Sequence, residues 1–413
     1  MHVCVLGAGI VGLATAYELQ RQGLQVTVVD RAGVAAGASG GNGAQLSYSY
    51  VQPLADPSIW LQLPKLLLSP DSPLKVRPQW DVQQWRWGME FMLACNAQTS
   101  ARTTASLLAL AAASRQGFER MMAAEGPECD YSSTGKLVLY PTAQSFAAAQ
   151  AQVQLQSALG SQQSAISAQA CCDLEPALAD YQAHIAGAIH TPSECAVDCM
   201  KLCIALERIL RAKGVTFVVN RPVKSIEMRQ GRAVAVHTSA GALEADQFVL
   251  AMGSDSVALA HTVGVRLPVY PLKGYSITLD IAANNAHCAP RINVTDIARK
   301  VVFARIGSRL RVAGMAELVG HDRSVSPKAI ASLRRSTQAV LPQLALSSED
   351  QPWAGLRPAT PTGLPIVGVQ PGGPSNLIVN TGHGALGLTL AFGTAQQVGQ
   401  HLEQLRAASP NAA

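Results

Sequence analysis

Two short apolar runs, separated by a segment in which apolar residues recur at helical spacing, open the chain. Residues 3–6 and 26–29 are unbroken apolar runs of the kind that buried parallel strands need. The helical pattern between them ends at Gly23, and Asp30 follows the second run directly. The pattern therefore predicts a strand, a helix and a second strand, with a carboxylate at the position where dinucleotide-binding proteins contact a ribose.

The turn between the first strand and the helix carries three glycines. Gly7, Gly9 and Gly12 stand in the register G-x-G-x-x-G. Gly7 permits a tight turn, Gly9 lets the backbone approach a pyrophosphate, and Gly12 lets the helix pack closely on its strand. Ile10 and Val11 open the helix and would offer backbone N–H groups to the anion. The combined pattern predicts nucleotide binding.

The rest of the chain alternates between segments that continue this unit and segments that interrupt it. Helical patterns are expected at 103–125, 143–158, 199–213, 327–340 and from about 385 to 406. Strands are expected at 135–140, 187–190, 215–219, 223–228, 233–238, 247–251, 269–280, 300–306, 309–315 and 376–380. We therefore predict an α/β protein with a discontinuous Rossmann-type domain (1–48, 190–260 and 345–413) and an inserted α+β substrate domain (49–189 and 261–344).

Composition narrows the function classes. The chain has 413 residues and a formal charge of +5, without the basic block that a nucleic-acid-binding surface requires. No run of eighteen apolar residues is present, so no membrane-spanning helix is expected. Because the first strand begins at Val3, we expect no signal peptide and a cytoplasmic location.

The cysteines and one serine motif point to no further chemistry. The nine cysteines form no C-x-x-C pair, and Cys195, Cys199 and Cys203 recur every four residues, as core-facing residues of a helix do. No metal site is predicted, since matched His or carboxylate ligands are lacking. Residues 37–41 match G-x-S-x-G, but no strand precedes them, so we interpret them as a phosphate or flavin loop.

A second Gly-rich turn, at residues 381–384, lies between a predicted strand and the last helix. The nicotinamide-binding pattern does not require such a turn so late in the chain. A reduced flavin carries negative charge near N1 and the C2 carbonyl, which a helix N-terminus stabilises. The turn therefore favours FAD over NAD as the cofactor.

Four stretches together resemble a known family. LGAGIVGLATAYEL, VYPLKGYS, RLRVAGMAELVG and GLRPATPTGLPIVG, followed by NTGHGALGLTLAFG, are similar to the bacterial D-amino acid dehydrogenases of the D-amino acid oxidase family. The resemblance spans essentially the whole chain. It implies a two-domain flavoenzyme in which a mixed sheet of the substrate domain covers the flavin.

The resemblance also assigns cofactor contacts. It implies that Asp30 and Arg31 hold the adenosine end, Ser39 the pyrophosphate region, and Val223 the adenine. The remaining implied contacts are Asn42, Gly43 and Gln45 along the flavin ring, Gly253, and Gly382, His383, Gly384, Gly387 and Leu388 at the pyrimidine edge. The loop reads GGNGAQ here, with a glycine order that differs slightly from the family's.

The implied reaction is oxidative deamination by hydride transfer from Cα to flavin N5. Arg357 is the candidate clamp for the substrate carboxylate, because a guanidinium pairs with a carboxylate in two parallel hydrogen bonds. The alternative is an arginine that joins strands through a buried carboxylate. Tyr275 and Tyr50 are candidate pocket residues, with a core tyrosine as the alternative for Tyr275, and His383 would position the ring. Thr362 stands where the family has an acidic residue.

The electron acceptor would be a quinone or another carrier. Residues 59–93 are rich in Trp and Leu, with Lys65, Lys75, Arg77 and Arg86 among them, a mixture suited to a membrane interface. We hypothesise peripheral attachment to the inner face of the cytoplasmic membrane. The alternative is that these residues form helices that pack over the active site.

Three alternative functions remain open from the sequence. The same fold could oxidise a cyclic secondary amine such as a D-proline derivative, or could act as an oxygen-using oxidase of D-amino acids or glycine. A flavin-bearing subunit that only transfers electrons is the third.

Overall fold

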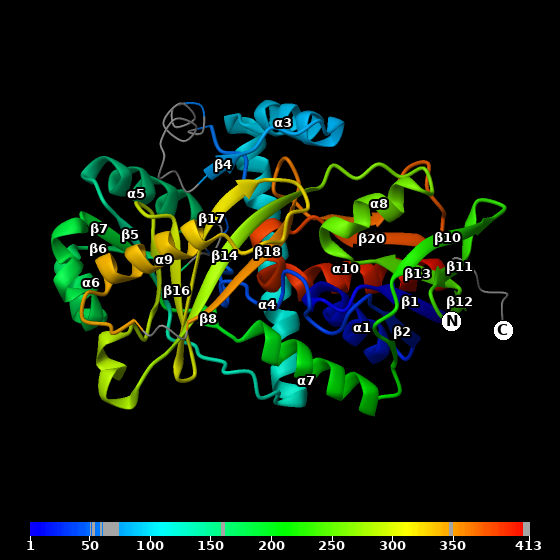
Figure 1. Ribbon diagram of the computed structural model, residues 1–413, viewed down its shortest axis with the longest axis horizontal. Helices are drawn as coiled ribbons and strands as arrows, with labels where there is room; N and C mark the ends of the chain where they lie inside the picture. The colour runs from blue at the N-terminus through cyan, green and yellow to red at the C-terminus, as the bar shows by residue number, and fades with distance from the viewer. Residues whose placement is uncertain are drawn as a thin grey trace.

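The computed structural model describes residues 1–49, 51, 54–57, 60, 74–157, 162–346 and 350–407. Two sheets lie at opposite ends of an elongated molecule (Figure 1). One sheet has six strands and the other has nine. The predicted α/β class with an additional mixed sheet is confirmed.

The six-stranded sheet is built from strands that are far apart in the chain. Its order is β19 (Ile366–Val369), β20 (Leu377–Thr381), β13 (Gln247–Leu250), β1 (His2–Leu6), β2 (Gln25–Val29) and β9 (Thr216–Val218). The strands from β20 to β9 are parallel, and β1 lies between β13 and β2. The predicted opening strands and the helix between them, α1 (Ile10–Arg21), are confirmed.

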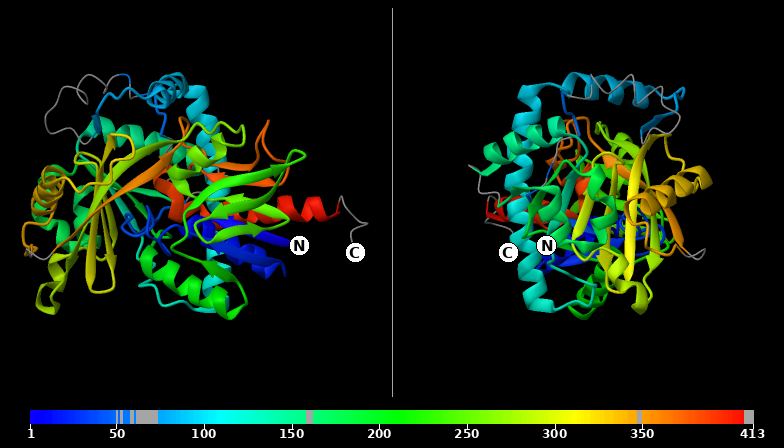
Figure 2. Two further views of the ribbon diagram at one scale, coloured as in Figure 1. Left: turned by 45° about the vertical axis from the view of Figure 1, so that its right-hand side comes forward. Right: turned by 90° about the vertical axis from the view of Figure 1, so that its left-hand side faces the viewer.

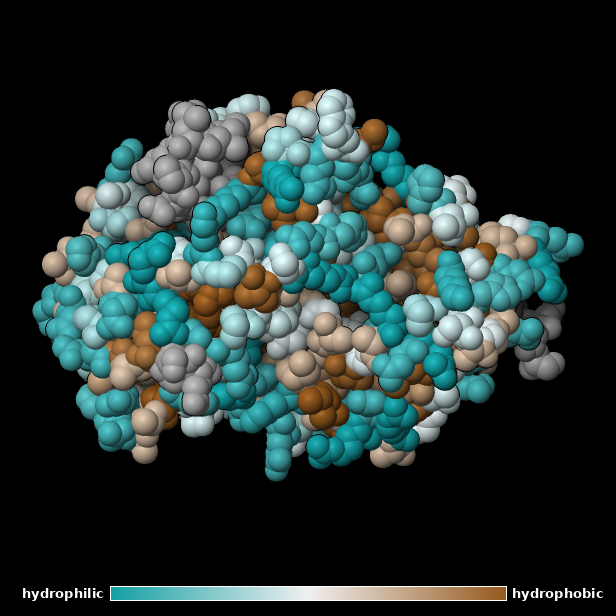
Figure 3. All heavy atoms as spheres, viewed as in Figure 1, coloured by the Kyte–Doolittle hydropathy of each residue, from teal (hydrophilic) through white to brown (hydrophobic). Residues whose placement is uncertain are grey.

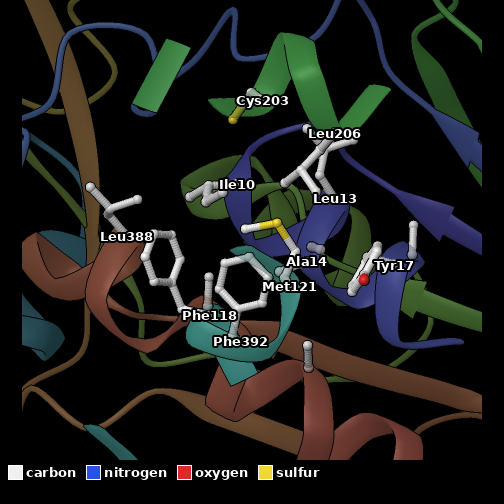
Figure 4. Close-up of a cluster of buried hydrophobic side chains, with 14 of the residues drawn as sticks. Ile10, Leu13, Ala14, Tyr17, Phe118, Met121, Cys203, Leu206, Leu388 and Phe392 are labelled. Carbon is white, nitrogen blue, oxygen red and sulfur yellow. The ribbon is translucent and has the colours of Figure 1, made fainter. Parts of the chain in front are cut away.

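Helices cover one face of this sheet. They are α1, α4 (Ala97–Glu125), α7 (Cys199–Ala212) and α10 (Gly387–Ala407). Figure 4 shows how Leu13, Phe118, Met121 and Phe392 converge from α1, α4 and α10. Cys203 belongs to the same core, which confirms its interpretation as a packing residue. All nine cysteines are buried and none is in a disulfide.

The other face carries a small sheet and a short helix. These are β10 (Val223–Arg229), β11 (Arg232–Thr238), β12 (Gly241–Glu244) and α8 (Ser256–His261). Their apolar residues pack against β1, β13 and β20 in a second core. Figure 2 shows the three strands projecting beside the six-stranded sheet.

The nine-stranded sheet is mixed. Its order is β18 (Gln351–Ala359), β14 (Tyr270–Asp280), β17 (Arg309–Leu318), β16 (Val301–Ile306), β15 (Asn293–Asp296), β5 (Lys136–Tyr140), β7 (Gly187–Thr191) and β6 (Ser164–Ile166), with β4 (Leu74–Val76) beside β17. Pairs β15–β5 and β17–β4 are parallel and the others antiparallel. Helix α9 (Pro327–Val340) packs on one face. The other described elements near this sheet are α3 (Val82–Ala94), α5 (Ala143–Ser157) and α6 (Ala168–Leu174).

The packing crosses the domain boundaries that we expected from the sequence. Helix α4 falls in the expected substrate segment 49–189, yet Leu107 and Phe118 of this helix lie in the core of the six-stranded sheet. Strand β18 falls in the expected cofactor segment 345–413, yet it pairs with β14 in the nine-stranded sheet. A linear division therefore separates elements that pack together, because Ala-rich helices and short strands do not encode which sheet they join.

Candidate active site

A cavity of about 770 Å³ lies between the two sheets. Its size is that of a cofactor pocket, and its wall takes residues from both sheets. The predicted cofactor residues that line it are Gly7, Gly9, Ile10, Val11, Asp30, Arg31, Ser39, Asn42, Gly43, Gln45, Val223, Gly253, His383, Gly384, Gly387 and Leu388. The structure thus brings together residues that are up to 381 positions apart in the chain.

Two predicted cofactor residues do not line the cavity, and both have a backbone role instead. A Cβ at Gly12 would lie 1.9 Å from the carbonyl oxygen of Gly7, so only glycine allows α1 to approach β1 so closely. Gly382 has φ +84°, and a Cβ there would lie 2.6 Å from Thr360. Gly12 thus has the packing role that its place in the motif predicts, whereas Gly382 serves the turn, and a direct cofactor contact by either residue stays a prediction.

The N-terminus of α1 faces the cavity through Gly9 and Ile10. The Ser39 hydroxyl accepts a hydrogen bond from the Ile10 backbone N–H at 3.0 Å. A Cβ at Gly9 would lie 3.2 Å from the Ser39 oxygen, so a larger residue would crowd this position. First-turn N–H groups and the helix dipole favour an anion here, as the sequence predicted.

The Asp30 carboxylate is fixed by the backbone on both sides. It accepts hydrogen bonds from the N–H groups of Ala8 and Ala32, each at 2.9 Å.

Arg31 forms an ion pair with Asp255 at 2.8 Å, and Arg323 pairs with the same carboxylate at 3.0 Å. Asp255 and Arg323 could not be identified from the sequence, because nothing near them in the chain indicates a nucleotide pocket.

The loop at residues 41–45 connects the two sheets. Ser276 of β14 donates a hydrogen bond to the Gly41 carbonyl at 2.7 Å, and Arg311 of β17 donates to the Asn42 carbonyl at 2.8 Å. Gln45 donates from its side-chain amide to the Val294 carbonyl at 3.2 Å and to the Phe303 carbonyl at 3.0 Å. These hydrogen bonds therefore hold the loop against the nine-stranded sheet, and the loop also lines the cavity.

The second Gly-rich turn places a helix start at the cavity. A single 3-10 turn (Gly384–Leu386) leads into α10, and a Cβ at Gly384 would meet no atom within 4 Å. His383 is buried, and its Nε2 lies 3.0 Å from the Thr394 hydroxyl. Burial lowers the pKa of His383 to about 3, so the ring is neutral at physiological pH. This arrangement supports a positioning role for His383.

Arg357 on β18 faces the cavity with a charge that no described carboxylate neutralises through an ion pair. Its Nη1 donates to the Met315 carbonyl at 2.8 Å. Burial lowers the pKa of Arg357 to about 10, so the group stays charged at neutral pH. The alternative of an arginine joining strands through a carboxylate does not match these contacts.

A local irregularity shapes the pocket around Arg357. Met315 has φ +64°, and the β14–β17 pairing shifts register between Lys273 and Tyr275. Such a bulge reorients the backbone, and here a carbonyl at Met315 reaches the guanidinium. Gly274 makes room, because a Cβ there would lie 2.3 Å from Arg357 Nη2.

Tyr275 borders the cavity, but its side chain belongs to the core beneath α9. Its hydroxyl donates to Glu317 at 2.7 Å, and burial raises the pKa of Tyr275 above its ordinary range. The next residue, Ser276, faces the opposite side of the strand and contacts Gly41. The structure therefore matches the core-tyrosine alternative, and a substrate contact by Tyr275 stays a prediction. Tyr50 lies outside the described residues.

One cavity residue that sequence analysis missed is Lys136. It begins β5, is 3% exposed, and donates from Nζ to the Ser47 hydroxyl at 2.8 Å. Burial lowers the pKa of Lys136 to about 8. A lysine inside the otherwise apolar strand GKLVLY was the available signal, since an ammonium group is rarely buried without a function or a partner.

FAD fits this set of residues. The start of α1 suits the diphosphate, the region of Asp30, Arg31 and Val223 suits the adenosine, and the start of α10 offers N–H groups to a flavin ring. When bound, FAD accepts two electrons from a substrate carbon.

The neutral state of His383 predicts how stability depends on pH. Unfolded histidine has a pKa near 6.5, so the unfolded chain gains a proton below that pH whereas folded His383 does not until about pH 3. Stability should therefore fall between pH 6.5 and 5, by about 2 kcal/mol from this residue. Urea unfolding at equal cofactor loading should show a smaller acid-induced loss in His383→Gln than in wild type. Equal losses would contradict the buried neutral state.

Comparison with known proteins places these features in context. A family model described as FAD dependent oxidoreductase matches residues 2–401. A Ralstonia nicotianae protein named D-amino acid dehydrogenase 2 is 45% identical over 406 residues, covering 96% of this chain and 95% of that protein. A Pseudomonas aeruginosa protein of the same name is 43% identical over 410 residues, covering 97% and 95%.

Solved structures share the fold at low sequence identity. Glycine oxidase from Bacillus cereus has a TM-score of 0.74 at 19% identity, over 97% of each chain. L-proline dehydrogenase from P. horikoshii has a TM-score of 0.74 at 14% identity, over 98% of this chain and 93% of that one. These likenesses extend to the fold alone.

Proposed function

The chain belongs to the family of FAD dependent oxidoreductases, and we propose that it catalyses the oxidative deamination of D-amino acids. The observation that carries the proposal is Arg357, a half-buried cation without a described ion-pair partner, in a cavity whose lining fits FAD. The names of two relatives above 40% identity support a D-amino acid as substrate.

The proposed reaction balances as a two-electron oxidation. The amino acid would lose a hydride from Cα, whose two electrons bound FAD would accept, and a proton from the amino group, which would pass to solvent. The resulting imino acid then reacts with water to give a 2-oxo acid and ammonia. Arg357 would bind the α-carboxylate and fix the orientation of Cα. Neutral His383, held by Thr394, would keep the turn before α10 in place. Partial burial of Arg357 between the sheets would strengthen this ion pair.

Replacing Arg357 tests the carboxylate contact. Arg357→Met should lower kcat/KM for D-alanine by the equivalent of about 2 to 5 kcal/mol, since the substrate charge loses its partner. Arg305→Met is a matched control, because Arg305 also donates to one backbone carbonyl, that of Ala286 at 3.1 Å, but does not line the cavity. A change of only a few-fold in Arg357→Met would exclude the carboxylate role.

We propose a quinone or another carrier, rather than oxygen, as electron acceptor, following the names of the relatives. The purified chain should then lose its flavin absorbance when a D-amino acid is added without oxygen, and should form little hydrogen peroxide in air. Stoichiometric peroxide would favour the oxidase alternative. Absence of bleaching with every D-amino acid and with D-proline would favour an electron-transfer subunit.

We also propose that α3 contacts a membrane surface. One face of α3 packs through Trp87 against Tyr270 and Leu272. This contact agrees in part with the alternative that residues 59–93 form helices packed on the protein. The other face is apolar and exposed at Val82, Trp85, Met89 and Leu93, with Leu93 79% exposed. Trp80 precedes this face and is fully exposed. Figure 3 shows white, pale teal and a few brown side chains mixed on the outer surface over α3.

Basic side chains near this face suit anionic lipids. Lys75 lies in β4, Arg77 follows that strand directly, and Arg86 lies on α3 itself. No helix in the described part of the chain is long and apolar enough to cross a bilayer. Of residues 59–73, the structure describes only Trp60, so most of the predicted contact segment lies outside the described residues.

Flotation with anionic liposomes tests the membrane contact. Trp85→Glu with Met89→Glu should lower the floating fraction at least about tenfold, because burial of each side chain is worth about 1.5 to 3 kcal/mol. Ala101→Glu with Ala105→Glu adds the same charge at the same spacing to an exposed face of α4 and serves as control. A wild-type protein that stays at the bottom of the gradient would refute the contact.

A further inference from the structure

Three charged residues form a connected group at the nucleotide end of the cavity. Asp255 pairs with Arg31 at 2.8 Å and with Arg323 at 3.0 Å, and all three residues line the cavity. We call this group the Asp255 clasp. Nothing in the proposed reaction requires Asp255 or Arg323, because the substrate would be oriented by Arg357.

One ion pair of the clasp passes the carboxyl end of β1. Strand β1 lies between β13 and β2, and the three strands are parallel. Asp255 ends a 3-10 turn (Gly253–Asp255) that follows β13, and Arg31 lies two residues beyond the end of β2. The pair therefore joins the two neighbours of β1 at the edge where the glycine turn leads into α1. First-turn N–H groups at this edge suit a diphosphate.

Arg323 reaches the clasp from the other sheet. It lies in the connection between β17 and α9, residues 319–326, whereas Asp255 and Arg31 follow strands of the six-stranded sheet. The preceding residue, Asp322, accepts a hydrogen bond from Lys273 Nζ on β14 at 2.9 Å. Consecutive residues of the connection are therefore bound to opposite sheets.

The two attachments differ in their exposure to solvent. Lys273, the lysine of the PLKGYS stretch, has a side chain that is 1% exposed, and a buried ammonium group needs a partner such as Asp322. Hydrogen bonds from the Ser324 backbone N–H and from Lys273 lower the pKa of Asp322 to about 2, so this carboxylate stays charged. The side chains of Arg323 and Asp255 are 43% and 25% exposed. Because water and salt screen exposed charges, the Arg323–Asp255 pair is the attachment that opens more easily.

We propose that the Asp255 clasp retains the nucleotide half of FAD, and that the Arg323–Asp255 pair must break before the cofactor leaves. The role concerns the cofactor alone and is independent of which substrate is oxidised. Asp255 shares its charge between two arginines, and such networks contribute more than isolated surface pairs.

The rate of FAD release from the holoenzyme tests the clasp. Holoenzyme is diluted into buffer without FAD, and the flavin absorbance that still elutes with the protein in gel filtration is measured at increasing times. Asp255→Asn keeps the shape of the side chain but removes its charge. It should accelerate FAD release about 3-fold to 10-fold, because two partly exposed ion pairs are lost.

Glu227→Gln is the matched control for this substitution. Glu227 is likewise shared by two basic side chains, Arg229 at 2.7 Å and His237 at 3.1 Å, but it is not among the described residues that line the cavity. The same change of charge at this position should leave FAD release at the wild-type rate.

Arg323→Met distinguishes the clasp from an independent cofactor contact. It should accelerate FAD release when Asp255 is present and have little further effect in Asp255→Asn, where the pair is already broken. Equal acceleration in both backgrounds would mean that Arg323 acts without Asp255, which would overturn the proposal.

Salt supplies a readout in the wild-type protein. Raising the ionic strength from about 0.01 M to about 1 M shortens the Debye length from about 30 Å to about 3 Å, and should accelerate FAD release more in wild type than in Asp255→Asn. Slower release from Asp255→Asn would contradict the clasp, since Asp255 would then withhold two arginines from the FAD diphosphate. Equal release, or full retention by both proteins, would also contradict it. None of these measurements involves turnover, so failure of the clasp and failure of the proposed function are distinguishable.

Discussion

The loop at residues 41–45 is the connection on which the rest of the site depends. Its carbonyls accept hydrogen bonds from Ser276 and Arg311, and Gln45 reaches the backbone of two further strands. Through these bonds the six-stranded sheet, which carries the nucleotide turn, is held at a fixed distance from the nine-stranded sheet, which carries Arg357. Because these hydrogen bonds hold the loop in the cavity wall, the loop contributes to the size of the cavity.

Desolvation sets the protonation states inside that cavity. Burial alone keeps His383 neutral, and it lowers the pKa values of Arg357 and Lys136 without removing their charges at neutral pH. A neutral imidazole and two cations therefore face the same space. Because burial lowers the effective dielectric constant around these groups, each interacts with a ligand more strongly than it would at the surface. Arg357 therefore presents a positive charge to the cavity before any substrate enters.

Much of the fold could be predicted from local pattern. The roles of the glycines in the first turn follow from local stereochemistry. The strand, helix and strand predicted from the apolar pattern are found as β1, α1 and β2. Arg357 could be named from its motif, and it lies in the cavity. The side of the strand to which Tyr275 points could not be predicted, because the bulge at Met315 alters the pairing of β14 with β17. Lys136 and the packing of α4 depend on contacts between distant segments, which periodicity does not contain.

The crossing of chain segments between the two sheets has a consequence for how the protein responds to its cofactor. Helix α4 and strand β18 tie each sheet to segments of the other, and both sheets line the cavity. A ligand that binds only the folded form at 100 times its dissociation constant adds about 2.7 kcal/mol to stability. This added free energy of unfolding stabilises both sheets, because the ligand would be released if either wall of the cavity unfolded. With the cofactor bound, the six-stranded and the nine-stranded sheet should therefore unfold together, in one cooperative transition.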